Sequence, residues 1–271
     1  MKVHHLNCGT VDVPLVGKNV CHVLACETDT GLVLVDSGFG LADMADRSRR
    51  LGPLPGLMGA KLIESEAAVR QLEHLGFAAT DVTHIIATHL DFDHIGGAAD
   101  FPSATIHTTA VEDAAARSRS AASDQLRYRP AQIPPEAVTR TYDGPGEEFL
   151  GFPGAYPLRA IGEGFALLPL PGHTKGHAAV AVDTGKDGWL VHAGDAFYHH
   201  SVVDTRDAGV LGRLSRGVET VLADDRSKIS ENHRRLRELN QQTSTRVRVF
   251  CAHDRTQFEE LRSSGSTTHI S

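Results

Sequence analysis

The ten residues 88–97 read Thr-His-Leu-Asp-Phe-Asp-His-Ile-Gly-Gly, and they decide how the rest of the chain is interpreted. The run at 83–88, apolar at its centre, predicts a β-strand that leads directly into them. Four side chains able to bind a metal then follow within six residues: His89, Asp91, Asp93 and His94. They cannot all face one way on a strand, but on a loop at a strand end they can converge. Imidazole and carboxylate together indicate a metal site.

Three more metal-capable side chains stand just past predicted strands further along the chain. They are His173 after the strand at 165–169, Asp195 after the strand at 189–192, and His253 after the strand at 247–251. Ligands gathered from several strand ends make a rigid, preorganised site. A single histidine after a strand carries little information, but three such positions added to a dense cluster indicate one shared metal centre.

Other segments predict strands and helices in alternation. A hairpin is expected from 20–26 and 32–35 around the turn at 29–31, and a further strand at 178–182. Helices are expected from Ser65 to Leu75, with Gly76 as the stop, at 109–120, from Ser230 to 241, and near 258–261. Residues 127–157 are rich in Pro, Gly and aromatic side chains, and we expect an excursion over the domain body there. Strands followed by helices in each half predict a sheet-on-sheet core with helices outside.

Composition limits the class of protein. The chain has 271 residues, a formal net charge of −7, 41% hydrophobic and 23% charged residues, which excludes collagen-like, coiled-coil and wholly disordered chains. The acidic balance argues against nucleic-acid binding, and no apolar stretch reaches the roughly 18 residues of a membrane span. The N-terminus lacks a signal-peptide core, so we expect a cytoplasmic location. The four cysteines form no Cys-x-x-Cys pair and are expected to be reduced and buried in strands.

This ordered set of motifs resembles that of the metallo-β-lactamase-fold superfamily of metallohydrolases, from Asp36 in the run 34–38 to His253. The resemblance implies an α/β fold, an αββα sandwich of two mixed β-sheets with helices on the outer faces. We expect a single domain over 1–263, with an inserted loop and helix segment at about 109–160. Residues 264–271 are expected to form a disordered tail.

The resemblance also implies a role for each metal-capable side chain. His89, Asp91 and His173 would hold a first ion, and Asp93, His94 and His253 a second. Asp195 would bridge the two ions, and Asp36 would stand behind the ligands as a supporting carboxylate. The expected cofactors are therefore two divalent metal ions per chain.

Asp91 departs from the commonest pattern of this family, His-x-His-x-Asp-His, in which the second His stands at its position. A carboxylate there resembles the flavo-diiron branch, which places Glu at this point and binds iron. An oxygen ligand makes the site harder and more anionic, which favours Fe or Mn without excluding Zn. Zinc is the first expectation, iron or manganese the second. An alternative is that Asp91 weakens the first site enough to leave a single metal.

Tyr198 stands three residues after Asp195, which resembles the N-acyl-homoserine lactonases, where such a Tyr hydrogen-bonds the carbonyl side of the substrate. A phenol can stabilise a developing oxyanion without carrying charge. The alternative is that Tyr198 only packs through its ring. Asp93 and Asp195, as metal-bound carboxylates, could steer a proton to the leaving group. The candidate catalytic residues are thus Asp93, Asp195 and Tyr198.

The function expected from these residues is metal-dependent hydrolysis. A metal-bound hydroxide would open a lactone or cleave a related ester or thioester. The partner would be a small-molecule substrate, with an acyl chain held by the apolar middle segment; neither a nucleic acid nor a membrane is expected, and a homodimer is compatible with the sequence. Two alternatives are a diiron oxidoreductase-like protein and a non-catalytic metal-bound sensor of an acyl ligand. No flavodoxin-like phosphate loop supports the former.

Overall fold

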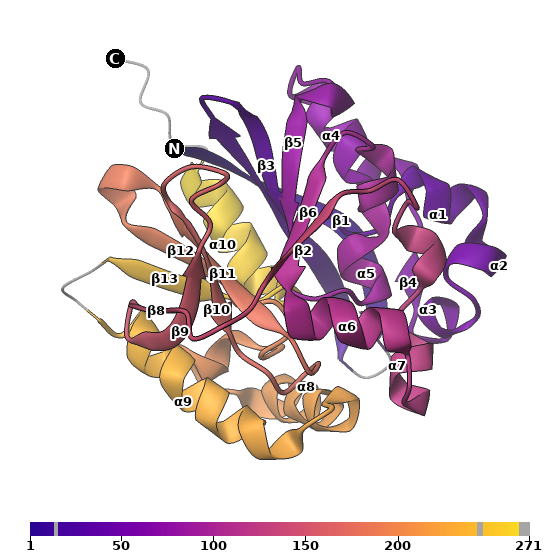
Figure 1. The fold of residues 1–271 in the computed structure, drawn as a ribbon. Helices are drawn as coiled ribbons and strands as arrows, with labels where there is room; N and C mark the ends of the chain where they lie inside the picture. The colour runs from indigo at the N-terminus through magenta and orange to yellow at the C-terminus, as the bar shows by residue number, and fades with distance from the viewer. Residues whose placement is uncertain (14–15, 243–245, 266–271) are drawn as a thin grey trace.

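The computed structural model describes residues 1–13, 16–242 and 246–265. Within those ranges two mixed β-sheets face one another, with helices around them (Figure 1). The first sheet has seven described strands in the order β4-β1-β2-β3-β5-β6-β7, and the second has six in the order β13-β12-β11-β10-β9-β8. The predicted α/β architecture of two mixed sheets with helices is confirmed.

The strands of the first sheet are β1 (Lys2–Val13), β2 (Gly17–Thr28), β3 (Gly31–Val35), β4 (Ala60–Lys61), β5 (Val82–Ile86), β6 (Thr105–Thr109) and β7 (Thr139–Tyr142). Those of the second are β8 (Glu147–Phe149), β9 (Phe152–Pro157), β10 (Phe165–Pro169), β11 (Ala178–Asp183), β12 (Trp189–His192) and β13 (Val247–Phe250). The first sheet is antiparallel from β4 to β3 and parallel from β3 to β7.

The described helices are α1 (Leu41–Ala45), α2 (Arg47–Arg50), α3 (Leu54–Leu57), α4 (Ala68–His74), α5 (Phe92–Ile95), α6 (Ala110–Ser118), α7 (Ala122–Arg127), α8 (Gly209–Leu222), α9 (Ile229–Asn240) and α10 (Arg255–Gly265). Among the residues described, no helix combines the length and the apolar character needed to cross a membrane.

Strand residues alternate between the space that separates the sheets and the layers of outer helices. Val33 of β3 shares the inner apolar core with Val180 of β11. Leu34 of β3 belongs instead to an outer cluster with Leu72 of α4, and a second outer cluster joins Leu236 of α9 to the other sheet. Because both faces of the central strands are covered, their sequences are continuous apolar runs.

The structure contains strands and one long helix that no predicted range covered. The segment 127–157, expected as an excursion, contributes β7 to the edge of the first sheet and β8 and β9 to the edge of the second. The segment is rich in Pro and Gly, which are generally depleted in strands. They are tolerated here because these strands lie near sheet edges. β1 and α8 were also missed.

The helix α4 begins later than expected, and α9 begins one residue earlier. A 3₁₀ turn at Glu64–Glu66 precedes α4, so that Ser65 is not its cap. Leu75, expected on the buried face, is 45% exposed because the helix ends at His74 and the chain turns at Gly76. Ser230 lies inside α9, which begins at Ile229.

The end of the chain is described only as far as Gly265. Residues 264 and 265 of the expected tail belong to α10, and 266–271 lie outside the described residues.

Each sheet brings several strand ends to one edge. β3 and β5 run parallel in the first sheet, and β10, β12 and β13 run in one direction in the second. The two edges adjoin, since the Ala178 amide donates to the carbonyl of Thr88 over 2.9 Å. The polar residues after these strands are therefore delivered to one place.

A buried histidine in β6 makes the fold sensitive to acid. His107 is fully buried, and its ring nitrogens contact Tyr142 Oη at 2.8 Å and His84 Nδ1 at 3.0 Å. Burial, followed by the charge of His84, lowers the pKa of His107 to about 3. The unfolded chain, with a His pKa near 6.5, binds more protons between these values. Stability is therefore lost as the pH falls from about 6.5 toward 3.

We predict that His107→Gln makes the free energy of unfolding less dependent on pH. Urea denaturation at about pH 7 and about pH 5 should show a smaller loss of unfolding free energy on acidification than in the wild type. The difference should correspond to the uptake of up to one proton on unfolding. Other titrations are shared by both proteins and cancel in the difference. The exposed His74→Gln variant should keep the wild-type dependence, and an unchanged slope for His107→Gln would contradict the assignment.

Candidate metal centre

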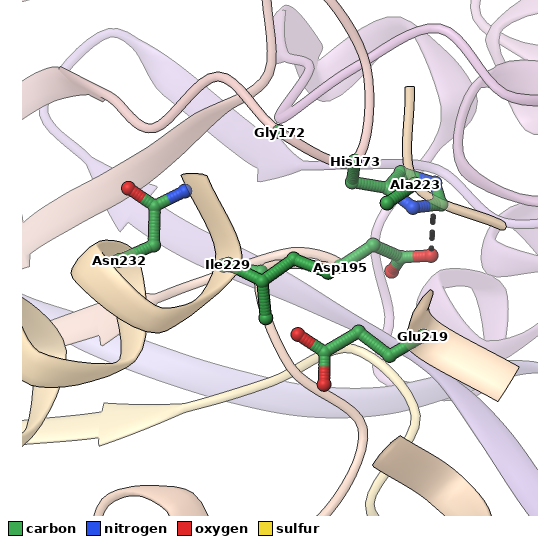
Figure 2. Close-up of a pocket in the computed structure, with 8 residues that line it drawn as sticks. Gly172, His173, Asp195, Glu219, Ala223, Ile229 and Asn232 are labelled. Carbon is green, nitrogen blue, oxygen red and sulfur yellow. Dashed lines mark ion pairs between the residues drawn. The ribbon is translucent and has the colours of Figure 1, made fainter. Parts of the chain in front are cut away.

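The first cluster forms where the loops after β5, β10 and β12 meet. His89, His173 and Asp195 place ligand atoms within 4.8 Å of one another. His173 Nε2 lies 3.4 Å from Asp195 Oδ2, and His89 Nε2 lies 3.9 Å from the same oxygen. Asp91 Oδ2 is 3.0 Å from His173 Nε2. These four residues are called the first cluster; Figure 2 shows His173 and Asp195 reaching toward each other.

The second cluster lies on the other side of Asp195. His94, Asp195 and His253 again place ligand atoms within 4.8 Å of one another. Asp195 Oδ1 is 3.2 Å from His94 Nε2 and 3.1 Å from His253 Nε2. Asp93 Oδ2 lies 3.6 Å from His253 Nε2 and completes what is called the second cluster. The structure thus brings all seven sequence-predicted ligands together.

Asp195 presents a different oxygen to each cluster. Oδ2 faces the first cluster, and Oδ1 faces the second. A carboxylate placed in this way can bridge two ions, which is the role expected for it from the sequence. Seven ligands also exceed what one ion needs, since four satisfy zinc.

Several buried polar atoms at the centre have no hydrogen-bond partner. They include His89 Nε2, His94 Nε2, Asp91 Oδ1 and Asp195 Oδ1. Such atoms are costly unless something satisfies them, and nitrogen and carboxylate oxygen are good ligands for divalent ions. The donor set therefore fits metal ions.

The electric field at the centre favours positive charge. Burial lowers the pKa of His253, but the Asp195 carboxylate outweighs it and holds this pKa well above its usual range. Burial opposes ionisation of Asp195 as well, yet His253, His94 and His173 keep its pKa well below the ordinary value. The Asp195 carboxylate is thus anionic and attracts cations.

Asp36 supports the second cluster from behind. Its carboxylate accepts hydrogen bonds from the Thr88 amide at 2.7 Å and hydroxyl at 2.9 Å, and contacts His94 Nδ1 at 2.9 Å. This fixes the His94 ring with Nε2 toward Asp195. Asp36 has a φ of 59°, a left-handed conformation that Asp tolerates better than most residues. The position agrees with the supporting role expected for it.

His177 and Gly194 fix the backbone at Asp195. The Asp195 amide donates to His177 Nε2 over 3.0 Å, and His177 Nδ1 contacts the Leu170 carbonyl at 3.1 Å. Burial holds the pKa of His177 well below its usual range, so the ring is neutral and can accept. Gly194 has a φ of 51°, and a Cβ there would lie 2.6 Å from His177 Nε2. Only glycine fits between them.

Sequence reasoning missed Glu112, a fully buried carboxylate of α6. It accepts hydrogen bonds from the amides of Leu90 and Gly176 at 2.9 and 3.1 Å and from the hydroxyl of Thr174 at 2.7 Å. Glu112 thereby holds together the two loops that carry His89 and His173. An acidic residue in the first turn of a helix is common, so nothing in the sequence marks it as special.

Arg127 was also missed, and it contacts the first cluster directly. Its Nη1 donates to Asp91 Oδ2 over 3.1 Å. Burial raises the pKa of Asp91, but the Arg127 guanidinium and then His89 hold it well below the usual range. Arg127 comes from α7, 36 residues along the chain from Asp91.

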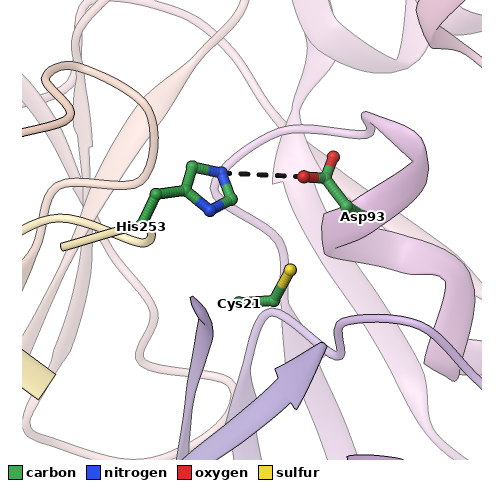
Figure 3. Close-up of side chains that lie close together, drawn as sticks. All are labelled: Cys21, Asp93 and His253. Carbon is green, nitrogen blue, oxygen red and sulfur yellow. Dashed lines mark ion pairs between the residues drawn. The ribbon is translucent and has the colours of Figure 1, made fainter. Parts of the chain in front are cut away.

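Cys21 of β2 lies beside the second cluster. Its sulfur, a carboxylate oxygen of Asp93 and a ring nitrogen of His253 lie within 4.8 Å of one another (Figure 3). Burial raises the pKa of the Cys21 thiol, and the other three cysteines are likewise free and buried, as expected. The sequence placed Cys21 in a strand but gave no sign that it approaches the centre.

A cavity of about 960 Å³ opens onto both clusters. Its base includes Asp91, Asp93, His173, Asp195, Tyr198 and His253. Its walls are mainly apolar, with Val11 and Val13 from β1, Leu54, Leu57 and Met58 around α3, and Leu214, Val218 and Val221 from α8. Of the middle segment 109–160, the described lining residues are Ser123, Leu126 and Arg127. The expectation that this segment builds the pocket is therefore wrong in the main, because α8 and α3 supply the walls.

Two facing sheets carry imidazole and carboxylate clusters at their shared edge, an arrangement that suits a metal centre. A profile described as "Metallo-beta-lactamase superfamily" matches residues 16–241. The chain belongs to this superfamily, which implies that divalent metal ions are its cofactors.

The chain is 44% identical to a probable metallo-hydrolase of Mycobacterium tuberculosis over 94% of this chain and 80% of the relative. An N-acyl homoserine lactonase of Bacillus cereus is 28% identical over 66% of this chain and 63% of that protein. Among solved structures, an N-acyl homoserine lactone hydrolase with N-hexanoyl-L-homoserine at its catalytic metal centre has a TM-score of 0.70 at 22% identity, covering 96% and 95% of the two chains. At that identity the structural match shows the fold.

We predict that Asp195→Ala lowers metal content at both clusters. The wild type should hold close to two ions per chain, because each cluster offers its own imidazoles and shares this carboxylate. Elemental analysis after dialysis should show a total content that falls by more than one ion per chain, which requires loss from both positions. Asp143→Ala, in the exposed loop after β7, should keep the full content. Full occupancy in Asp195→Ala would show that Asp195 is not a bridge.

Proposed function

We propose that this protein is a dinuclear metal-dependent hydrolase that opens lactones carrying an apolar acyl chain. The observation that carries the proposal is the cavity of about 960 Å³, which has both clusters at its base and aliphatic walls. Apolar pockets with a few convergent polar groups are typical of small-molecule sites. The similarity to N-acyl homoserine lactonases supports this substrate class.

The shape of the cavity suits a substrate with a polar head and an aliphatic tail. The ester would lie at the base near Asp93, Asp195 and Tyr198, and the chain would extend along Val218 and Leu214 of α8. Burying methylene groups contributes about 0.8 kcal/mol each. The walls thus favour longer chains, while the base selects the reacting group.

Tyr198 is held at the base as a neutral hydrogen-bond donor. Its hydroxyl donates to Asp195 Oδ2 over 3.0 Å and lies 3.4 Å from His173 Nδ1. Burial, then the charges of Asp195 and Asp93, raise the pKa of Tyr198 well above its usual range. The phenol therefore keeps its single proton, and to stabilise a developing oxyanion it would turn this proton from Asp195 to the substrate.

The first cluster would hold one divalent ion and the second cluster another. When bound, such ions supply Lewis-acid polarisation of a carbonyl and activation of water. The chain's own residues would do the rest. Asp93, 13% exposed at its side chain and open to the cavity, is placed to carry a proton toward the leaving alkoxide. Asp195 orients the Tyr198 hydroxyl.

The function is tested by turnover of a substrate panel with the zinc-loaded protein. The panel contains N-acyl homoserine lactones of short and long chain, an unsubstituted lactone, an aryl ester and a thioester. We expect the highest kcat/KM for the long-chain lactone, rising by up to about fourfold per buried methylene. Val218→Thr should reduce only the long-chain preference. Tight binding of all compounds without turnover would contradict a hydrolase and favour a ligand-holding protein.

We predict that Tyr198→Phe lowers kcat about tenfold on the best lactone. Losing an oxyanion donor costs a hundredfold or more when nothing else shares the task, and here the ions share it. KM should change less, because the hydrogen bond strengthens in the transition state. Metal content should equal that of the wild type. Wild-type kcat in this variant would reduce Tyr198 to a packing residue.

A further inference from the structure

Arg127 joins three separate segments at the first cluster. Besides Asp91, its Nη1 donates to the His173 carbonyl over 3.1 Å, and its Nη2 donates to the Leu222 carbonyl at the end of α8 over 2.6 Å. The guanidinium side chain is 11% exposed and the Asp91 side chain 10%. A guanidinium bound in this way has little freedom to move.

We propose that Arg127 is a positioning residue that balances the charge of Asp91 and thereby sets the metal preference of the first cluster. The inference rests on the proposed dinuclear centre. Arg127 lies outside the sequence motif of residues 88–97, so the motif gives no indication of this role.

The charge of the centre supports this role for Arg127. Asp91, Asp93 and Asp195 bring three carboxylates into one buried centre. A buried carboxylate needs a partner, and Arg127 supplies a full positive charge to Asp91. The pair Asp91–Arg127 adds no net charge to the first cluster. The preference for Fe or Mn that an extra anionic oxygen ligand would give to the site is therefore offset. Zinc remains the favoured ion.

The position of the guanidinium also supports this role. Arg127 Nη1 lies 3.1 Å from Asp91 Oδ2 and 3.3 Å from His173 Nε2, so it contacts two members of the first cluster at once. Asp91 Oδ1 is buried without a hydrogen-bond partner. The guanidinium thus binds Oδ2, the oxygen that also faces His173, while Oδ1 has no hydrogen-bond partner. Partners of ligands that act in this way typically change metal affinity by 10- to 100-fold.

The test is competitive metal loading, read by elemental analysis rather than by activity. Each variant is reconstituted with equal Zn(II) and Mn(II), and the Mn/Zn ratio is measured. Arg127→Gln leaves the Asp91 charge unbalanced, and we expect the ratio to rise about tenfold, the low end of the range for such partners. Arg127→Lys keeps the charge and should stay near the wild type.

A second variant separates charge from structure. Asp91→Asn/Arg127→Gln removes both charges, so the Mn/Zn ratio should return toward the wild type. If the ratio changed only because the hydrogen bonds from Arg127 to α8 and the His173 loop were lost, the double variant would not restore it. Arg159→Gln, which breaks an exposed bidentate pair with Glu147, is the matched control and should change nothing.

The outcomes distinguish the two proposals. An unchanged ratio in Arg127→Gln, with two ions still bound, would overturn the role of Arg127 and leave the hydrolase intact. A raised ratio that the double variant does not reverse would overturn the charge argument in the same way. A wild-type protein that takes up neither ion would contradict the proposed centre itself.

Discussion

The accumulation of negative charge in a buried place is the constraint on which this structure depends. Asp36, Asp91 and Asp195 are each at least nine-tenths buried, and such carboxylates are costly unless paired. Asp36 is satisfied by Thr88 and His94, whereas Arg127 binds only Oδ2 of Asp91 and leaves its Oδ1 without a partner. Asp195 lies among imidazoles, two of which, those of His89 and His94, have an unpartnered Nε2. Asp36 and Asp91 thus have partners within the chain, whereas Asp195 and the imidazoles around it are arranged to bind cations.

The two sheets make that arrangement possible. Parallel pairs, β3 with β5 and β12 with β13, deliver successive chain segments to one edge, and no single loop could supply the same ligands with comparable rigidity. Glu112 and His177 then lock the loops by hydrogen bonds to backbone amides. The helices that close the cavity, α3 and α8, contribute side chains of a different kind, mostly aliphatic. Chemistry and binding are thus carried by different layers of the fold.

The central strands and the candidate ligands were accessible from sequence because both leave local signals. Leu34 and Val35 lie in a continuous apolar run, and His89 to His94 lie within a few residues of one another. Arg127 and Glu112 leave no such signal, since their partners are 36 and 22 residues away. The same holds for α8, whose exposed Val210, Leu211 and Val221 give an ambiguous pattern. β7 to β9 were missed because their pairing partners, not their own residues, make them strands.

Asp195 offers one oxygen to each cluster, and this has a consequence for loading. The two oxygens of one carboxylate are joined rigidly, so an ion that holds Oδ2 restricts the positions open to Oδ1. Occupation of one position would therefore preorganise the other, and the two uptake equilibria would be thermodynamically linked.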